Sequence, residues 1–413
     1  MEFLKVDTVE TARAKLFASV KDWIASAETI TPKEALGRIL AEDIYTSEDI
    51  PAFRRSTVDG FAVFSADTAA AGESLPVFLT VKDRIEMGRQ AAVDISRGEC
   101  AEVPTGGMLP GGADAVVMTE YAEPFGEDDI AVYHSAAYGE NVVLPGEDVK
   151  RGALLLRRGR RILYRDVGAL AAAGVTSLRA YAHPRVSILS TGDELITPDL
   201  TPRPGQIRDI NTSALSALAE THGYTIAGSA VLPDDEAVLQ REILKAMENS
   251  DIVIVSGGSS KGKKDMTREV IDRISSPGVY THGMAVKPGK PAILGYDAAS
   301  RTVLAGLPGH PVSAMMVFEL LFGWLRREIT GCPMEPAIPA RVSRNIASSP
   351  GKLTCWPCEL EWIGGEYRAE PIFGKSGLIT TLTRADGYFV VDRDAEGVKQ
   401  GEIVLVHLFA KSR

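Results

Sequence analysis

The strongest constraint on the fold is an alternation of short apolar segments with longer amphipathic ones between residues 183 and 330. The apolar segments have the length and composition of strands, and the amphipathic ones have the period of helices. This alternation predicts a parallel sheet of the doubly wound kind, and such sheets bind ligands beyond the carboxyl ends of their strands. The predicted strands are 186–189, 225–232, 252–255 and 302–305, and the predicted helices are 211–222, 234–249, 267–274 and 311–329.

The other parts of the chain have different patterns of apolar, glycine and polar residues, so we expect a multidomain α/β protein. Residues 51–141 contain short β-type runs between glycine-rich turns and predict a β-rich domain. Residues 1–50 and 142–182 have a mixed pattern and are expected to form one small mixed α/β domain. The doubly wound domain is assigned to 183–330. After Gly331 the helical pattern stops, and residues 331–413 predict a C-terminal β domain.

The charge balance and the cysteine count exclude several classes of protein. The net charge is −10, which argues against general binding to nucleic acid or to an anionic membrane. A local basic pocket for one small anion remains compatible with it. Four cysteines are too few for a disulfide scaffold. The first 15 residues do not resemble a signal peptide, and the apolar run 312–325 is too short to span a bilayer. We therefore expect a soluble cytoplasmic protein.

Two segments that follow predicted strands carry polar residues suited to a phosphate or a cation. The segment 190–194 reads Ser-Thr-Gly-Asp-Glu, which offers backbone N–H groups and two carboxylates for a phosphate or a hydrated magnesium ion. A helix N-cap with acidic first-turn residues is the more common explanation of such a segment. The segment 256–265 nearly matches a P-loop, but Lys264 stands where that motif needs Ser or Thr. Its glycines and lysines still suit an anion, and Asp265 can hold a cation beside it; the alternative is a solvated basic turn.

Two proline-rich loops come later in the chain. In the segment 287–291, Lys287 and Lys290 lie on a loop that two prolines stiffen, which lowers the entropy lost when the lysines bind an anion. His310 lies in a Leu-Pro-Gly-His-Pro loop before the long apolar helix and is a candidate ligand or acid–base group. A loop histidine is more often neither.

Isolated carboxylates and a cysteine pair complete the candidates. Asp59 and Asp148 each lie in a glycine-containing turn, where a structural role is the more common one. Cys355 and Cys358 form a Cys-x-x-Cys motif in the β-rich tail, without a second pair at metal-binding spacing. We interpret them as structural thiols in preference to a redox or zinc site.

Taken together and in this order, eight segments resemble the molybdopterin molybdotransferase family, of the MoeA type, which is related to the E domain of gephyrin. The resemblance covers almost the whole chain, and it rests on the order of the segments, since none is decisive alone. The matching segments are 56–60, 105–107 with 112–117, 146–148, 190–195, 205–211, 256–265, 287–291 and 307–314.

The resemblance implies a specific activity. Members of the family insert molybdenum, or tungsten in some organisms, into molybdopterin that is adenylated on its phosphate, and they release AMP with the help of Mg²⁺. It also implies four domains, including a MogA-like doubly wound domain and a C-terminal β-barrel-like domain. An elongated homodimer would form each site between two subunits. Further partners would be the adenylyltransferase that supplies the substrate and the molybdoenzymes that receive the cofactor, with no nucleic acid and no membrane.

The resemblance also assigns residues. The implied catalytic residues are Asp59, Glu194, Asp265, Lys287 and Lys290, of which Glu194 and Asp265 would hold magnesium. The implied substrate-binding residues are Thr105, Asp148, Asp209, Ser256, Gly257, Gly258, Ser259, Pro308, His310 and Pro311.

The chain departs from the family pattern at a few positions. His310 stands where many members have Asn, and Asp386 replaces the Asn of a late Ala-Asn-Gly. The Asp-Gly motif begins Ser56-Thr57-Val58 where Ser-Ala-Met is frequent. Two alternative functions stay open at this point. One is a molybdopterin adenylyltransferase, and the other is a non-enzymatic dimeric scaffold with the same fold.

Overall fold

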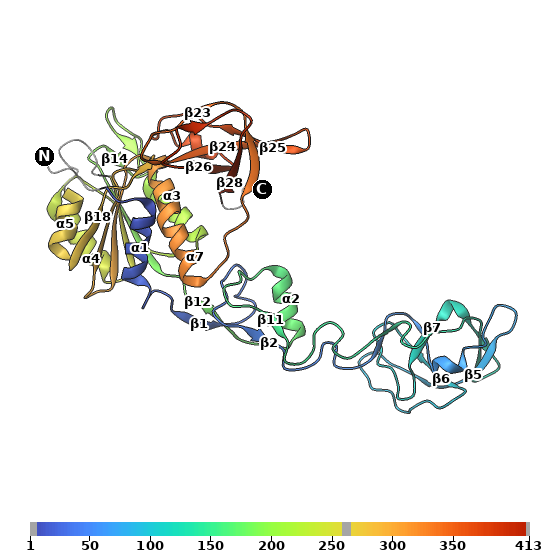
Figure 1. Cartoon of the computed structure of the whole chain (residues 1–413). Helices are drawn as coiled ribbons and strands as arrows, with labels where there is room; N and C mark the ends of the chain where they lie inside the picture. Colours follow the sequence, from blue (N-terminus) through green and yellow to red (C-terminus); the bar gives the residue numbers. More distant parts are fainter. Residues whose placement is uncertain (1–5, 258–265, 410–413) are drawn as a thin grey trace.

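The computed structural model describes residues 6–257 and 266–409 of the 413-residue chain, and it is elongated (Figure 1). A doubly wound domain and a C-terminal β domain are packed together at one end. A small mixed domain follows, and a β-rich domain lies at the opposite end. No helix in these two ranges is long and apolar enough to cross a membrane.

The doubly wound domain is built on a six-stranded mixed sheet. Its order is β16-β13-β17-β21-β20-β18. The first four strands are parallel, as predicted, whereas β20 and β18 are antiparallel and were not predicted. The strands are β13 (Arg185–Thr191), β16 (Thr225–Leu232), β17 (Ile252–Gly257), β18 (Pro277–His282), β20 (Ile293–Asp297) and β21 (Thr302–Leu307).

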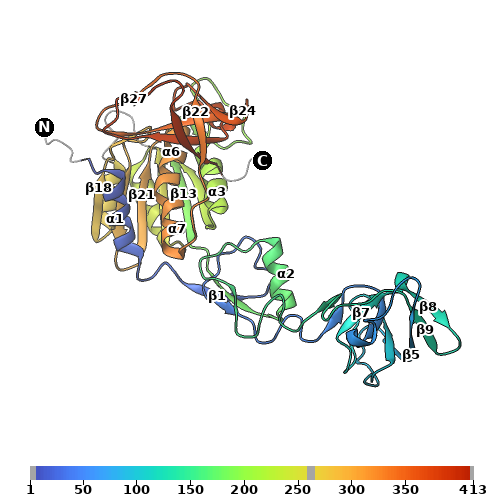
Figure 2. The same ribbon diagram turned by 45° about the vertical axis from the view of Figure 1, so that its right-hand side comes forward.

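Helices cover both faces of this sheet. One face packs against α1, α3, α6 and α7, which Figure 2 shows in front of the strands, and the other packs against α4 and α5. The predicted helix 311–329 is interrupted by η3, a π-helical turn. The helices are α1 (Val9–Val20), α3 (Asn211–Thr221), α4 (Glu236–Met247), α5 (Met266–Ile274), α6 (Pro311–Phe318), η3 (Glu319–Gly323) and α7 (Trp324–Thr330).

Helix α1 packs with the doubly wound domain, although the sequence assigns residues 1–50 to the small mixed domain. Val9, Ala12, Leu16 and Val20 are fully buried in the same core as β13 and β21. Their i, i+3, i+4 spacing makes one apolar face, and the sheet covers that face. The small mixed domain begins after α1 and contains β1 (Ala27–Ile30), β2 (Ile44–Tyr45), β11 (Leu154–Leu156), α2 (Tyr164–Ala172) and β12 (Leu178–Tyr181).

The β-rich domain at the far end has a six-stranded sheet of order β7-β4-β6-β5-β9-β8. Two short strands, β3 (Arg55–Ser56) and β10 (Val142–Val143), pair where the chain enters and leaves it. The sheet strands are β4 (Gly60–Val63), β5 (Val77–Arg84), β6 (Glu99–Val103), β7 (Ala115–Met118), β8 (Ala122–Phe125) and β9 (Asp129–Val132).

The C-terminal domain is a closed five-stranded β-barrel, which agrees with the predicted fold class. Strands β24, β25, β22, β28 and β26 pair in turn, and β26 returns to β24. Strand β19 (Val286–Lys287), from the doubly wound domain, pairs in parallel with β24 and so joins the two domains. The barrel strands are β22 (Ile338–Val342), β24 (Leu353–Ile363), β25 (Glu366–Pro371), β26 (Gly387–Val391) and β28 (Ile403–Leu408).

Candidate active site

A hydrogen-bonded polar group lies beyond the carboxyl ends of the parallel strands. Asn211, the first residue of α3, donates from Nδ2 to Ser256 Oγ at 2.8 Å and to the Gly309 carbonyl at 2.8 Å. Ser256 in turn donates to the Pro308 carbonyl at 3.3 Å. The predicted residues Ser256 and Pro308 are therefore brought together, and Pro311 follows Gly309 by two positions. Asn211 links them; it lies in a segment that matches the family but was not among the predicted site residues.

Asp209 caps α3 from within this group. Its side chain is buried and accepts hydrogen bonds from the backbone N–H groups of Asn211 at 3.1 Å and Thr212 at 3.3 Å. The hydroxyl groups of Thr212 and Ser190, at the end of β13, are hydrogen-bonded to each other. A carboxylate at a helix N-terminus is stabilised by the free N–H groups and the helix dipole, so Asp209 orders the floor of the crevice.

Gly257 ends β17 in a conformation that requires glycine. Its φ is +119°, and a Cβ there would collide with the Thr191 carbonyl. Gly258, Ser259 and Asp265 were predicted to follow in the same site, and they lie outside the described residues. Glu194 is exposed on the loop after β13, so it lies beyond the same strand ends.

Two buried oxygen atoms at these strand ends have no partner among the described residues. Thr191 Oγ1 and Asn211 Oδ1 are inaccessible to water and make no hydrogen bond within the ranges 6–257 and 266–409. Among the residues described, no three His, Cys, Asp or Glu side chains gather as a metal site. Hydroxyl, amide and carboxylate oxygens are the kind of ligand that Mg²⁺ prefers, so the donor chemistry of Thr191, Asn211 and Glu194 is compatible with that ion.

A cavity of about 460 Å³ lies between the doubly wound domain and the barrel. Lys287 ends β19 and Lys290 lies on the loop that follows, while Lys352 and Lys375 come from the barrel domain. The lining contains no carboxylate within the described ranges. The remaining polar side chains of the lining are Ser313, Thr354, Cys355, Trp356, Ser376 and Thr381.

The Lys287–Lys290 loop is held tightly against the body of the protein. Gly289 has a φ of +119°, and a Cβ there would collide with the side chain of Val317 in α6. Lys287 Nζ donates to Ser349 Oγ at 3.0 Å, and the Lys290 carbonyl accepts from the Met284 N–H at 2.9 Å. The two ammonium groups are thus presented by a fixed backbone.

His310 connects the two walls of this cavity. Its Nδ1 lies 2.8 Å from Ser376 Oγ, and the Ser376 carbonyl accepts from the Val312 N–H at 3.2 Å. His310 precedes α6, and Pro311 is the first residue of that helix. The barrel loop that carries Lys375 is therefore tied to the loop that carries the polar group at the strand ends.

Three predicted site residues lie far from this cavity in the same chain. Asp59 accepts hydrogen bonds from the Thr105 N–H at 2.6 Å and from Thr105 Oγ1 at 3.0 Å, within the β-rich domain (Figure 1). These bonds lower the pKa of the Asp59 carboxyl below its usual range. Asp148 is exposed on the segment that leaves this domain, and its N–H donates to the Ile50 carbonyl.

The two C-terminal cysteines belong to different cores. Cys355 is buried in the core of the doubly wound domain, and Cys358 is buried inside the barrel. Residues three apart on strand β24 point to opposite faces, so the two thiols do not face each other. Burial raises the pKa of each thiol to about 12. Both are therefore neutral at physiological pH, which fits structural thiols.

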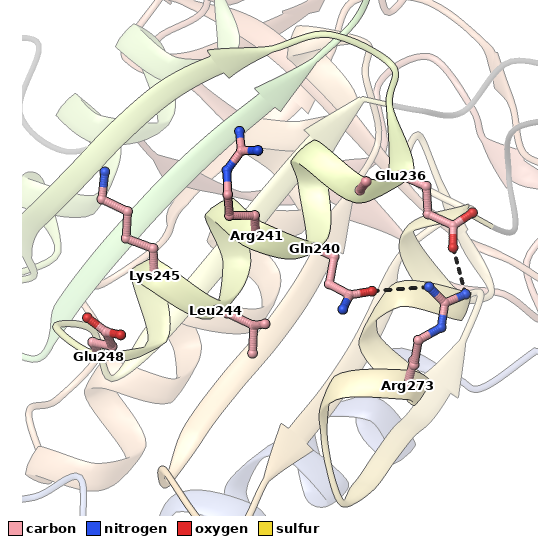
Figure 3. Close-up of a pocket in the computed structure, with 8 residues that line it drawn as sticks. Glu236, Gln240, Arg241, Leu244, Lys245, Glu248 and Arg273 are labelled. Carbon is pink, nitrogen blue, oxygen red and sulfur yellow. Dashed lines mark hydrogen bonds and ion pairs between the residues drawn. The ribbon is translucent and has the colours of Figure 1, made fainter.

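A second groove lies on the outer face of α4 and α5 (Figure 3). Its charges are largely satisfied within the groove. Arg273 pairs with Glu236 at 2.6 Å and donates to Gln240 at 3.1 Å. Without a set of free charges of one sign, this groove is a poorer candidate for an anionic substrate than the lysine cavity.

Sequence reasoning did not single out Lys352, Lys375 or Ser376, and it placed Ser313 in a segment that matches the family without giving it a role in the site. Lys352 and Lys375 lie in the C-terminal region, outside any recognisable motif. The packing of the barrel against β19 brings them into the same cavity as Lys287 and Lys290. No local sequence pattern predicts that contact.

Three family models together match most of the chain. Residues 7–174 match the family model "MoeA N-terminal region (domain I and II)". Residues 187–327 match the "probable molybdopterin binding domain", and residues 339–409 match the "MoeA C-terminal region (domain IV)".

Relatives are similar over almost their full length. A putative molybdopterin biosynthesis protein of Methanocaldococcus jannaschii is 32% identical over 91% of this chain and 90% of its own. A molybdopterin molybdenumtransferase of Bacillus subtilis is 30% identical over 92% of this chain and 89% of its own. The crystal structure of a molybdopterin biosynthesis MoeA protein from Pyrococcus horikoshii has a TM-score of 0.82 at 34% identity, and the match covers 98% of this chain and 99% of that one.

Proposed function

The chain belongs to the MoeA family of molybdopterin molybdenumtransferases, and on that premise we propose that it inserts molybdenum or tungsten into adenylated molybdopterin with release of AMP. It is an enzyme of molybdenum cofactor biosynthesis. The substrate, the oxyanion and the released nucleotide are the proposed details.

The observation that carries the proposal is the lysine cavity. Four ammonium groups line about 460 Å³ with no carboxylate among the described lining residues, in a protein whose net charge is −10. Such a cavity concentrates a dianion such as molybdate or tungstate against the overall charge. Lysine ammonium groups bind oxyanions through charge-assisted hydrogen bonds, and the hydroxyls of Ser313 and Thr381 can add neutral ones.

The adenylated substrate would lie beyond the neighbouring strand ends. Ser256, Gly257 and the loop of Pro308 form the wall of the crevice that doubly wound sheets use for ligands. Glu194, together with Asp265 from the motif, would hold Mg²⁺ there. When bound, this ion would neutralise charge on the phosphates as the P–O bond of the adenylate breaks. Lys287 and Lys290 would hold the oxyanion at the adjoining cavity.

The position of Asp59 supports the proposal that two subunits share each site. Its carboxyl is kept ionised by Thr105, yet it lies at the opposite end of the chain from the lysine cavity (Figure 2). A homodimer would bring the β-rich domain of one subunit to the cavity of the other, where Asp59 could orient water or the oxyanion. Asp148, on the segment leading to that domain, would approach the substrate in the same way.

Release of AMP tests the proposal. The purified protein is incubated with adenylated molybdopterin, Mg²⁺ and either molybdate or tungstate. We expect AMP release that depends on the oxyanion, and the comparison of the two anions gives the metal preference. Tight binding of the adenylate without AMP release under either condition would contradict the proposal and favour a scaffold. Formation of the adenylate from ATP would indicate an adenylyltransferase instead.

A further inference from the structure

One wall of the lysine cavity is a barrel segment that buries little apolar surface. Residues 373–378 follow β25, precede the short helix α8 (Thr380–Thr383), and include Lys375 and Ser376 of the cavity lining. The two large apolar residues of the segment, Phe373 and Leu378, are 55% and 54% exposed. Since apolar burial contributes little here, the position of the segment depends on its hydrogen bonds.

Ser376 makes the hydrogen bonds that join this segment to the doubly wound domain. Its carbonyl accepts from the Val312 N–H at 3.2 Å, and its Oγ lies 2.8 Å from His310 Nδ1. Among the described residues, no other hydrogen bond links residues 373–378 to that domain. Lys375 directly precedes Ser376, so its place in the cavity follows from these two contacts.

Both contacts come from the N-terminus of α6. His310 is the N-cap residue of this helix, its carbonyl accepts from the Ala314 N–H at 2.9 Å, and its side chain makes no capping hydrogen bond. The first N–H groups of a helix have no partner within the helix, and the Ser376 carbonyl provides one for Val312. The imidazole of His310 is therefore available for the hydroxyl of Ser376.

The backbone around His310 is fixed by its neighbours. The Gly309 carbonyl accepts from Asn211 Nδ2 at 2.8 Å, and Pro311 begins α6 with a restricted φ. The ring of His310 also lies close to the barrel segment, because a Cβ placed on Gly377 would be 3.8 Å from His310 Cδ2. A side chain held in this way can determine where its hydrogen-bond partner lies.

We propose that His310 is a positioning residue for the metal oxyanion, and that its Nδ1 contact with the Ser376 hydroxyl holds Lys375 at the cavity. This role rests on the proposed function, because it assumes that the cavity receives molybdate or tungstate. The imidazole acts through Ser376 and does not contact the substrate. Loss of the contact weakens the binding of the oxyanion and leaves the site of the adenylated molybdopterin at the strand ends unchanged.

Two substitutions distinguish the two nitrogens of the imidazole. The side-chain amide of Asn reaches about as far as Nδ1, the amide of Gln reaches about as far as Nε2, and either amide can hydrogen-bond a hydroxyl. His310→Asn should therefore keep the contact with Ser376, and His310→Gln should lose it. In AMP release, we expect the KM for molybdate to rise about three- to tenfold in His310→Gln and to stay near the wild-type value in His310→Asn. The kcat and the KM for adenylated molybdopterin should change little in either variant.

A double-mutant cycle tests whether His310 acts through Ser376. In the Ser376→Ala background, His310→Gln should not raise the KM for molybdate further, because the contact is already lost. Arg384→Gln, which breaks an exposed ion pair with Glu359 just after α8, is the matched control and should leave both KM values unchanged. Additive effects, or wild-type kinetics in His310→Gln, would overturn the proposal. A variant pair in which Gln restores activity and Asn does not would overturn it too, since Nε2 would then be the acting atom.

Calorimetric titration with tungstate separates this proposal from the proposed function, because binding requires no turnover. If the wild type binds tungstate without releasing AMP, the proposed function fails, whereas weaker binding in His310→Gln alone supports the role of His310. If the wild type releases AMP and all three proteins bind tungstate equally, the role of His310 fails and the proposed function stands. A wild type that does not bind tungstate would reject both.

Discussion

At the scale of single residues, the proposed oxyanion site is defined by the positions of four lysines. Lys287 and Lys290 belong to a recognisable motif and were predicted, because two prolines mark a stiff loop in the sequence. Lys352 and Lys375 were not predicted, because they reach the cavity only when the barrel domain packs against the doubly wound domain. Gly258, Ser259 and Asp265 lie outside the described residues, so their part in the site stays a prediction.

Removing one lysine from the cavity should specifically weaken the binding of the oxyanion. Lys290→Ala deletes one charge-assisted hydrogen bond, which corresponds to about a ten- to hundredfold increase in the KM for molybdate. Lys352→Ala should act in the same direction, although it lies in another domain. Steady-state AMP release at varied molybdate checks this. Lys245→Ala, on the outer face of α4, is the matched control, and an equal effect there would contradict the assignment.

The hydrogen bond from Thr105 to Asp59 should set the acid side of the pH profile. Thr105→Val removes the Oγ1 donor and keeps the backbone one, so the pKa of the Asp59 carboxyl rises towards its ordinary value. Because the ionised form is the one proposed to act, the acid limb of the rate profile should move to higher pH.

The control for this variant is a similar pair elsewhere in the same sheet. Thr80 Oγ1 donates to Asp129 at 2.7 Å. Thr80→Val removes a comparable hydrogen bond away from the proposed site and should leave the profile unchanged. A profile that is the same for Thr105→Val and the wild type would remove Asp59 from the proposed chemistry.

At the scale of helices and strands, segments with strong hydrophobic periodicity were predicted correctly. The remaining elements depend on contacts with distant parts of the chain. The four parallel strands were predicted from their apolar runs. Strands β18 and β20 were missed because Pro277, Gly278 and Gly295 interrupt their pattern. Helix α1 was recognised, but its partner was not, since an apolar face does not indicate which core covers it.

The glycine in the lysine loop should be indispensable. Gly289→Ala adds a methyl group that collides with Val317, at a φ that L-residues rarely adopt, so the loop must move and carry both lysines with it. We expect a large loss of molybdate-dependent AMP release and a lower melting temperature.

Gly168 offers the opposite control for that substitution. It lies in helix α2, and a Cβ there would contact nothing within 4 Å. Gly168→Ala should raise stability by about 0.5–1 kcal/mol through helix propensity and leave activity unchanged. Equal behaviour of the two variants in melting and activity assays would mean that the loop is not constrained as described.

At the scale of the whole molecule, the family and the multidomain fold class were predictable because motifs occur along almost the entire chain. The resemblance implied an elongated dimer, and no local sequence pattern indicates the elongated shape of the chain. The shape separates Asp59 and Thr105 from the lysine cavity, which is why the proposed function requires two chains (Figure 1).

Mixed dimers should reveal whether two subunits share each site. At a molybdate concentration well below the KM of Lys290→Ala, the Asp59→Ala and Lys290→Ala subunits are each expected to show little activity alone. After mixing and exchange, a shared site restores about a quarter of wild-type activity, since half of the dimers are mixed and each holds one intact site. AMP release before and after exchange measures this. No recovery despite verified subunit exchange would place both residues in the same subunit's site.

The cavity between the doubly wound domain and the barrel is proposed to receive the metal oxyanion, and diffraction from crystals soaked in tungstate, at the tungsten absorption edge, can locate that anion. We expect one dominant peak among Lys287, Lys290, Lys352 and Lys375, which disappears when Lys290 is replaced by Ala. A dominant peak elsewhere, with no peak in this cavity, would show that the cavity does not bind the oxyanion.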